Sequence, residues 1–368
     1  MFNNLSLSRQ REVIMIRKTM KIAGAGTLSG ILALTATAYA ADPQSFSRFF
    51  DPRKAFSGSA VLHSLLPGEE NTTPSAGVTA HPGHGLYRSG AAPVRASASE
   101  TSLWDSELFS EARFMMNIRP STAERKTARQ LARSFTQHMQ KSELYMHYLL
   151  TQLKERGLPL ELAAVPLVES GFNPRAVSHA GAHGVWQFTR QTGGSYGLQR
   201  GNGYDDFYDF IKSTAASLSY LEHLHRQFGD WDLALVAYNQ GEFGIKRAIA
   251  AAKARGVTDI SVRTIALSSV ARGYLRHVRA YAELLRNPEA YGARRPEIKN
   301  RPAFKRIDVG GKVHSMKEVA MLSGADIRDL KHLNAGFLTD NISATRQQEL
   351  LVPVEHATAL ERAMARMD

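Results

Sequence analysis

The chain has 368 residues, 43% of them apolar, contains no cysteine, and carries a formal net charge of +12 at pH 7. The apolar fraction excludes a protein with many membrane spans, and the lack of cysteine excludes disulfide bonds, zinc–thiolate sites, cysteine nucleophiles and a lipid-modified N-terminal cysteine. The basic excess favours a polyanionic partner, and charge alone does not distinguish nucleic acid from bacterial cell wall.

Residues 1–40 have the pattern of an export signal. Basic residues precede a short apolar stretch from Ile22 to Thr35, and the small-x-small sequence at 38–40 is typical of a cleavage site. The alternative is an uncleaved membrane anchor, but the stretch is marginal in length for a bilayer and is interrupted by glycines and threonines. We therefore predict a signal peptide that is removed on export, with membrane attachment only if this segment stays uncleaved.

Residues 41–102 follow as a stretch rich in Pro, Gly, Ser and Ala. Such a composition does not bury enough apolar surface to offset the entropy lost on ordering the chain. We predict that this stretch is a mostly disordered tether.

The segment 103–295 has the periodicity of helices. Ser121 and Glu124 form a capping box, and apolar residues at helical spacing continue to about Arg156, which predicts one long helix. Pro159 then begins the next helix. Further helices are expected at 211–228, 233–238, 243–254 and 268–286. Because no convincing strand alternation occurs in this segment, we predict an α-helical domain.

After a linker marked by Pro296 and Pro302, residues 302–356 have mixed patterning. Short strands are expected at 304–309 and 349–352, and helices at 316–322 and 327–333. This order predicts a compact βααβ unit, small but within the size that folds alone. The predicted fold class is mainly α, with a helical domain followed by a small βααβ unit.

Glu169 falls at the end of an apolar helix and is followed by Ser170-Gly171. The partial negative charge of a helix C-terminus and apolar surroundings both raise the pKa of a carboxyl group. A raised pKa keeps the group protonated near neutrality, as a general acid requires. Taken alone, a solvated glutamate at a helix end is the more common explanation.

Three further motifs follow this glutamate along the chain. In order, the motifs are Glu169-Ser170, Gly184-Val185-Trp186-Gln187, Ala237-Tyr238-Asn239-Gln240-Gly241 and Tyr274. This series resembles that of the lytic transglycosylases of the lysozyme-like clan. The likeness runs from about Leu103 to Tyr291.

The resemblance implies a lysozyme-like catalytic domain that acts on the glycan strands of peptidoglycan. It implies that the bond from N-acetylmuramic acid to N-acetylglucosamine is cut without water, leaving 1,6-anhydro ends, with Glu169 as the sole catalytic acid/base. The residues implied to bind the sugar are Ser170, Gln187, Tyr238, Asn239 and Tyr274. Amides and hydroxyls suit sugar hydroxyls, and aromatic faces suit sugar C–H surfaces.

The same resemblance implies a location in the periplasm or cell envelope, reached through the N-terminal signal. It implies peptidoglycan as the partner in place of nucleic acid, and neither a cofactor nor a metal. His179 and His183 are four residues apart in a glycine-containing loop without an adjacent carboxylate. We interpret them as a solvated pair and predict no metal site there.

Two alternatives stay open. A hydrolytic lysozyme on the same fold would use a second carboxylate. The nearby candidates for that carboxylate are Asp205, Asp206, Asp209 and Glu242. A non-catalytic wall-binding protein could retain the fold, although the presence of Glu169 argues against it.

The C-terminal unit resembles a LysM module, a glycan-binding repeat with which related enzymes often end. The likeness rests on Ser315-Met316, Leu330, Leu333-Asn334 and Leu350-Leu351-Val352-Pro353. The match is degenerate, with Ala335 where proline is usual. The sequence therefore predicts a LysM-like fold and leaves glycan binding by this unit undecided.

Overall fold

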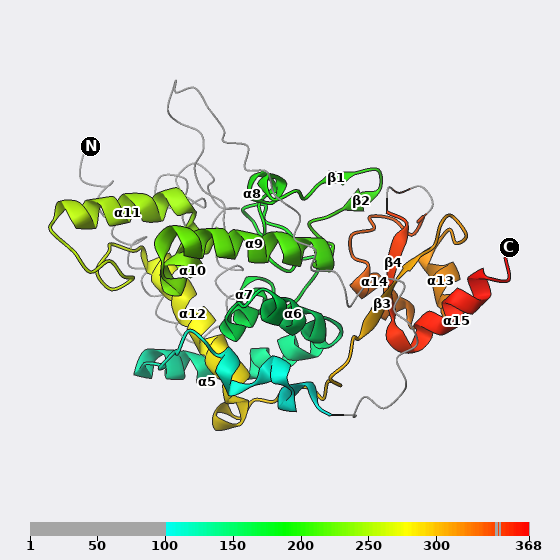
Figure 1. Cartoon of the computed structure of the whole chain (residues 1–368), viewed down its shortest axis with the longest axis horizontal. Helices are drawn as coiled ribbons and strands as arrows, with labels where there is room; N and C mark the ends of the chain where they lie inside the picture. The colour runs from blue at the N-terminus through cyan, green and yellow to red at the C-terminus, as the bar shows by residue number, and fades with distance from the viewer. Residues whose placement is uncertain (1–100, 343–344, 346, 368) are drawn as a thin grey trace, which may run out of the picture. The chain divides into compact units, whose positions relative to one another are not determined.

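The structure is a computed structural model that describes residues 101–342, 345 and 347–367. The predicted signal peptide (1–40) and residues 41–100 of the predicted tether lie outside the described residues. Helices make up most of the segment up to residue 295 (Figure 1). In chain order, with η marking 3₁₀ helices, its elements are η2 (Leu103–Asp105), η3 (Glu107–Phe109), η4 (Glu111–Arg113), α5 (Thr122–Lys141), α6 (Glu143–Glu155), η5 (Leu160–Ala163), α7 (Ala164–Glu169), α8 (Arg190–Ser195), β1 (Arg200–Gly201), β2 (Tyr204–Asp205), α9 (Phe210–Phe228), α10 (Trp231–Gln240), α11 (Glu242–Ala254), α12 (Ser269–Arg286) and η6 (Pro288–Tyr291).

The predicted helical character of this segment is confirmed, with one correction at Ser142. The sequence predicts a single helix to about Arg156, but the chain is broken there into α5 and α6. The hydroxyl of this fully buried serine donates to the carbonyl oxygen of Met139 at 2.8 Å. Serine competes for backbone hydrogen-bonding groups in this way and so favours helix ends. After the break, α6 packs against η5 and α9.

Helix α12 holds the other helices of this segment together. It packs against α5, α7 and α10. Its buried residues recur at helical spacing and include Ala271, Tyr274, Val278 and Tyr281. Burial of one large apolar side chain stabilises the fold by roughly 1.5–3 kcal/mol. This buried face therefore fixes α12 against α7, and with it the end of α7 at Glu169.

The hairpin of β1 and β2 is an element that the sequence did not predict. Its two strands pair antiparallel, with Arg200 opposite Asp205. Each strand has only two residues, which is too short for an alternation of apolar and polar side chains to be visible. Asn202 in the connecting turn has a φ of +47°, a left-handed conformation that asparagine tolerates. The asparagine of the turn was thus a feature of the sequence from which this hairpin could have been predicted.

The predicted βααβ unit is confirmed. Its elements are β3 (Phe304–Asp308), α13 (Met316–Ser323), α14 (Ile327–Leu333) and β4 (Glu349–Pro353). The two strands pair antiparallel, with Phe304 opposite Pro353 (Figure 1). Asn334 ties α14 to β4, because its side-chain nitrogen donates to the Leu351 carbonyl and its oxygen accepts from the Leu351 amide.

A further helix, α15 (Val354–Met364), follows β4 directly and was not predicted. It packs against β3, β4 and α13. Its buried residues Ala357, Leu360 and Met364 have helical spacing. The signal was therefore present in the sequence, but the predicted unit ended at residue 356.

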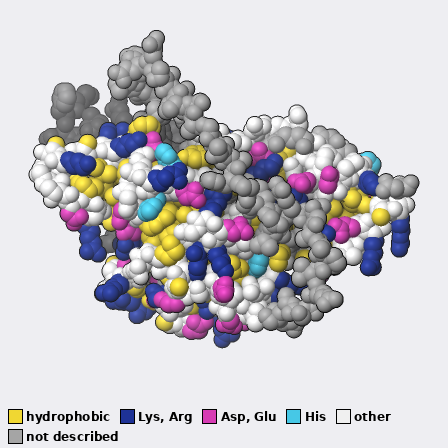
Figure 2. Space-filling view, in the orientation of Figure 1, with side chains coloured by type: hydrophobic (Ala, Val, Ile, Leu, Met, Phe, Trp, Pro, Cys, Tyr) yellow, Lys and Arg dark blue, Asp and Glu magenta, His cyan; other side chains and the backbone are white. Residues whose placement is uncertain are grey.

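No helix within residues 101–342 and 347–367 is long and apolar enough to cross a bilayer. Figure 2 shows Lys and Arg side chains spread over one face of the molecule among Asp and Glu side chains. On that face the basic excess is distributed and does not form a single patch.

Candidate active site

Glu169 is the last residue of α7, at the contact of that helix with α12. One carboxyl oxygen, Oε1, is buried and makes no hydrogen bond with the described residues, while the residue as a whole stays partly exposed. Burial raises the pKa of Glu169 to about 8, and the hydroxyl of Tyr274 lowers it in part. The carboxyl therefore keeps its proton at neutral pH, as a general acid requires.

Tyr274, on α12, is the neighbour of Glu169 across this helix contact. Burial raises the pKa of Tyr274, and the Glu169 carboxyl adds to that effect. Its phenol oxygen, like Oε1 of Glu169, is buried without a hydrogen bond of normal geometry to the described residues. The two groups are thus close enough to influence each other, while both retain hydrogen-bonding capacity for a further molecule.

The chain turns sharply directly after Glu169. Gly171 and Phe172 both have a φ of +58°, and the Phe172 side chain is fully buried. A Cβ at Gly171 would lie 2.6 Å from the ring of His138, so glycine is required by both conformation and space. Burial lowers the pKa of His138 to about 4, which keeps its ring neutral at pH 7. The His138 ring is therefore an uncharged side chain that packs against the turn.

The loop around Gly184 is held against this turn. Ser170 Oγ donates to the carbonyl oxygen of Val185 at 2.8 Å. A Cβ at Gly184 would lie 1.9 Å from the carbonyl oxygen of Phe207, so this position requires glycine. Gln187 has a φ of +52°, and its side-chain nitrogen donates to the Gly184 carbonyl at 2.8 Å. The side-chain donors of Ser170 and Gln187 are therefore used to brace the loop.

Tyr238 and Asn239 come from α10. The fully buried Tyr238 hydroxyl donates to the carbonyl oxygen of Trp186 at 2.7 Å and contacts Ser217 Oγ at 2.8 Å. Burial raises the pKa of Tyr238, and Glu169 adds to that effect, which indicates that the two side chains are near each other. The amide oxygen of Asn239 is buried without a hydrogen bond to the described residues. Asn239 thus retains an acceptor that Tyr238 does not.

The fold therefore brings the residues predicted from the sequence into one region, but their side chains differ in whether they are already hydrogen-bonded within the protein. Glu169, Tyr274 and Asn239 each keep a buried polar atom without a hydrogen bond among the described residues. The other three use their side-chain donors within the protein; they are Ser170, Gln187 and Tyr238. Their roles in binding sugar stay predictions.

Two residues of this region were not found from the sequence. His138, on α5, packs against Gly171, and Ser217, on α9, contacts the Tyr238 hydroxyl. Both lie far along the chain from the residues that they touch, and neither belongs to a local motif. A single sequence carries no signal for such contacts.

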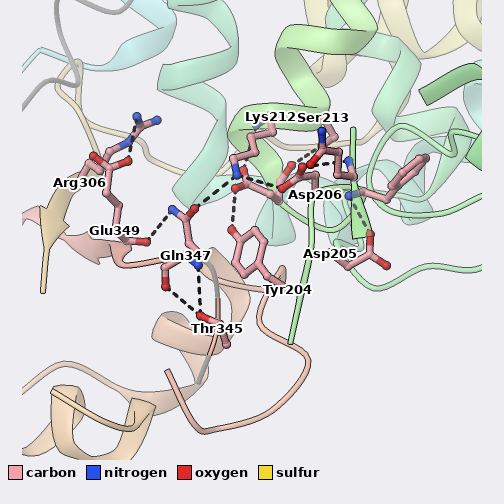
Figure 3. Close-up of polar contacts among 12 residues, drawn as sticks. Tyr204, Asp205, Asp206, Lys212, Ser213, Arg306, Thr345, Gln347 and Glu349 are labelled. Atoms are coloured by element: carbon pink, nitrogen blue, oxygen red, sulfur yellow. Dashed lines mark hydrogen bonds and ion pairs between the residues drawn. The ribbon is translucent and has the colours of Figure 1, made fainter. Parts of the chain in front are cut away.

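Two of the four carboxylates considered as a second catalytic group are bound to cations. Asp205 is fully buried and accepts two hydrogen bonds from the Arg190 guanidinium, at 2.7 and 2.6 Å. Asp206 forms an ion pair with Lys212 at 2.9 Å, as Figure 3 shows. The shift in the pKa of Glu169 comes from burial and from Tyr274, and neither aspartate contributes to it.

The other two carboxylates are also engaged. Asp209 caps the start of α9, and it accepts a hydrogen bond from the Tyr204 hydroxyl at 2.6 Å. Glu242 lies 3.2 Å from His223 Nε2 and 3.4 Å from Lys246 Nζ. Among the described residues, Glu169 is thus without a second carboxylate that influences its pKa.

The two histidines that the sequence analysis interpreted as a solvated pair have different surroundings. His183 Nδ1 lies 3.0 Å from the Tyr208 hydroxyl, whereas His179 is exposed. In the part of the chain that the structure describes, no group of three His, Asp or Glu side chains is arranged to hold a metal ion.

Comparisons with known families define the class of the helical segment. Residues 146–260 match the family described as the transglycosylase SLT domain, a range that includes Glu169 and ends before Tyr274. Residues 303–368 match the family described as the LysM-like domain of lytic transglycosylase MltD. These two segments are therefore similar to domains of lytic transglycosylases, an SLT domain followed by an MltD-type LysM-like domain.

The chain is also similar to individual lytic transglycosylases. The chain is 35% identical to membrane-bound lytic murein transglycosylase D of Escherichia coli strain K12 over 226 residues, 61% of this chain and 50% of that protein. It is 34% identical to membrane-bound lytic murein transglycosylase F of Desulfosudis oleivorans over 103 residues, 26% of this chain and 21% of that protein. The chain thus spans half the length of the transglycosylase D that it matches.

Among solved structures, the lytic transglycosylase Slt of Pseudomonas aeruginosa is similar over 41% of this chain and 25% of that chain. The sequence identity is 21% and the TM-score is 0.32.

Proposed function

We propose that the protein is a peptidoglycan lytic transglycosylase in which Glu169 is the single catalytic acid and base. The matched SLT domain and the names of the murein transglycosylases that resemble the chain support this proposal. The observation that carries it is the buried carboxyl of Glu169, whose pKa of about 8 leaves it protonated at neutral pH.

In the proposed first step, Glu169 donates its proton to the glycosidic oxygen between N-acetylmuramic acid and N-acetylglucosamine. The bond to C1 of the muramoyl sugar breaks, and the leaving sugar departs as an alcohol. In the second step, the resulting carboxylate takes the proton from the C6 hydroxyl of the same muramoyl sugar. The C6 oxygen bonds to C1, which closes the 1,6-anhydro ring and returns Glu169 to its protonated form.

The substrate-binding residues have two kinds of role in this proposal. The Tyr274 hydroxyl and the Asn239 amide oxygen bind polar groups of the sugar, since the first is buried with the Glu169 carboxyl beside it and without a hydrogen bond of normal geometry, and the second is buried without a hydrogen bond to the described residues. Ser170, Gln187 and Tyr238 shape the site, since their side-chain donors already hold the loop after Glu169.

A hydrolytic lysozyme on the same fold is the competing mechanism. Such an enzyme uses a second carboxylate to activate water or to form a covalent intermediate. The four candidates are engaged with cations, a tyrosine or a helix end, and none affects the pKa of Glu169. An intramolecular hydroxyl in good geometry reaches effective molarities up to ~10⁵–10⁸ M, which exceeds the concentration of water.

The place of action belongs to the same proposal. The export pattern of residues 1–40 supports a location in the periplasm or cell envelope, where peptidoglycan is the partner. The similarity to transglycosylases that are described as membrane-bound agrees with an envelope location.

The released products test the proposal. Purified sacculi are digested with the wild type and with Glu169→Gln, and the muropeptides are analysed by mass spectrometry before and after borohydride treatment. We expect wild-type products whose muramoyl ends are one water lighter than hydrolysed ends and do not react with borohydride. A digest dominated by reducible ends would contradict the single-residue mechanism. Asp205, Asp206, Asp209 and Glu242 would then be mutated in turn to find the second carboxylate.

A further inference from the structure

Residues 334–338, which we call the 334–338 turn, follow α14 of the C-terminal unit and are hydrogen-bonded to the β1–β2 hairpin of the helical segment. The Asp205 amide donates to the Gly336 carbonyl at 2.8 Å, and the Leu338 amide donates to the Gly203 carbonyl at 2.9 Å. Backbone hydrogen bonds of this kind add the turn to the β1–β2 hairpin as a third strand would be added.

Side chains are exchanged across the same boundary. Tyr204 of the hairpin packs in the core of the C-terminal unit, where its ring meets that of Phe337 edge to face with centroids 4.8 Å apart. Conversely, Phe304 and Leu333 of the C-terminal unit belong to the core of the helical segment. Because each part buries apolar side chains of the other, the two parts are not joined only by a linker.

Polar side chains between the two parts are bonded to each other (Figure 3). Lys212 Nζ contacts the side chains of Asp206 at 2.9 Å and Gln347 at 3.4 Å, and Arg306 pairs with Glu349 at 3.4 Å. Lys212, Gln347, Arg306 and Glu349 line a cavity of about 210 Å³, and Glu169 is not among its lining residues. The contact of Lys212 with Gln347 joins the two parts, whereas Arg306 and Glu349 both belong to the C-terminal unit.

A further contact leads from the 334–338 turn to the neighbourhood of Glu169. Arg175 Nη2 donates to the Phe337 carbonyl at 2.5 Å. Arg175 belongs to residues 173–189, which we call the 173–189 loop, and the same loop accepts the Ser170 hydroxyl at the Val185 carbonyl. The C-terminal unit and the residue next to Glu169 thus hold one loop at two points.

We propose that the LysM-like unit positions the 173–189 loop, and through it the surroundings of Glu169, by way of the 334–338 turn. Arg175, Tyr204 and Gly336 are then positioning residues for the reaction. This inference rests on the proposed function of Glu169. It gives the LysM-like unit a part in turnover on soluble glycan, which a module that only binds insoluble wall does not have.

Gly336→Ala tests this link in the full-length protein. A Cβ at Gly336 would lie 2.4 Å from Cζ of Tyr204, whose ring is held by Phe337 and by a hydrogen bond to Asp209. We expect amide hydrogen exchange in the 173–189 loop to accelerate on the order of tenfold, as in a local opening. Gly201→Ala is the matched control, since it lies in the same hairpin with open space around the added Cβ.

Turnover of a soluble glycan fragment provides the second measurement. We expect kcat to fall about tenfold in Gly336→Ala, because a small displacement near the reacting atoms has effects of this size. Pelleting with insoluble peptidoglycan should stay within about twofold of the wild type. The Gly201→Ala control should match the wild type in both measurements.

Arg175→Ala keeps the inference testable if Gly336→Ala does not fold, because the Arg175 side chain is exposed and its loss removes only the bond to Phe337. Unchanged loop exchange in a folded variant of either kind would overturn the proposed link. The exchange experiment contains no substrate, so it gives its answer even if the wild type proves inactive on peptidoglycan. Accelerated loop exchange with an inactive wild type would reject the proposed function alone.

Discussion

Glu169 and the three aspartates Asp205, Asp206 and Asp209 are carboxyl groups of the helical segment that differ in their hydrogen-bond partners. Glu169 has a buried oxygen without a hydrogen bond among the described residues. Asp205, Asp206 and Asp209 are buried as whole residues, and each accepts a hydrogen bond from a cation or a tyrosine. Glu169 lies at the end of α7, and the three aspartates lie at and just before the start of α9.

The contrast shows that burial alone does not identify a catalytic acid. Hydrogen bonds from a cation compensate for the cost of burying a carboxylate, so such a group contributes to the fold. A buried carboxyl without such a partner takes up a proton, and that proton is available for transfer. These surroundings support the proposal that Glu169 is the catalytic acid and that Asp205 has a structural role.

Replacing Glu169 has the largest expected effect. In Glu169→Gln the amide keeps the shape of the side chain but neither donates nor retrieves the catalytic proton. We expect turnover on sacculi to fall at least ~10²-fold, the low end for a positioned general acid. The fold should persist, as measured by circular dichroism and a cooperative thermal transition. Turnover within a few-fold of the wild type would exclude Glu169 as the catalyst.

The activity and the stability of the wild type should both depend on pH, because the pKa of Glu169 is raised. As pH rises through about 8, Glu169 loses its proton, and kcat/KM on a soluble glycan should fall about tenfold per pH unit. Between pH 4.5, the ordinary pKa of a glutamate, and a pH of about 8, Glu169 holds a proton in the folded protein that it has lost in the unfolded chain. Over this window the free energy of unfolding should decrease with rising pH, by up to about 1.4 kcal/mol per pH unit.

Glu169→Gln is the control for this pH dependence, because glutamine does not titrate. Its stability relative to the wild type should increase steadily from pH 5 to pH 8 in denaturant titrations. If the two proteins kept a constant difference across that range, the carboxyl of Glu169 would have an ordinary pKa.

Asp205→Asn has the smallest expected effect, and it acts on stability. The substitution weakens the double hydrogen bond to Arg190 and leaves that guanidinium without its counter-charge. We expect the free energy of unfolding to fall by about 1.5–3 kcal/mol, the range for a hydrogen bond to a charged group. Loss of turnover with unchanged unfolding would reverse the assignment and make Asp205 a catalytic group.

The sequence predicted those features that depend on neighbours along the chain. The capping box at Ser121 and Glu124 begins α5, and the apolar run before Glu169 forms a helix that ends at that residue. The patterns at 304–309 and 349–352 became β3 and β4. In each case the local preference and the final packing agree, so a short window of sequence is sufficient.

Features that depend on distant contacts were not predictable. The pairing of Asp205 with Arg190, the packing of His138 against a distant turn and the insertion of Tyr204 into the other core all join residues far apart in sequence. The contacts of the Tyr238 hydroxyl illustrate the same limit. A tyrosine motif does not reveal that the hydroxyl is already bonded to the Trp186 carbonyl and contacts Ser217.

The neutral carboxyl of Glu169 has a consequence for how ionic strength acts on the protein. With its proton in place, Glu169 brings no full negative charge to a bound sugar at neutral pH. The net charge of residues 41–368 is +8, since residues 1–40 contribute five basic residues and one acid to the total of +12. This charge instead acts at long range, on the approach to an anionic wall, and salt screens that attraction within about 10 Å at 0.1 M. Salt should therefore weaken capture on the wall while leaving the cleavage of a small uncharged glycan nearly unchanged.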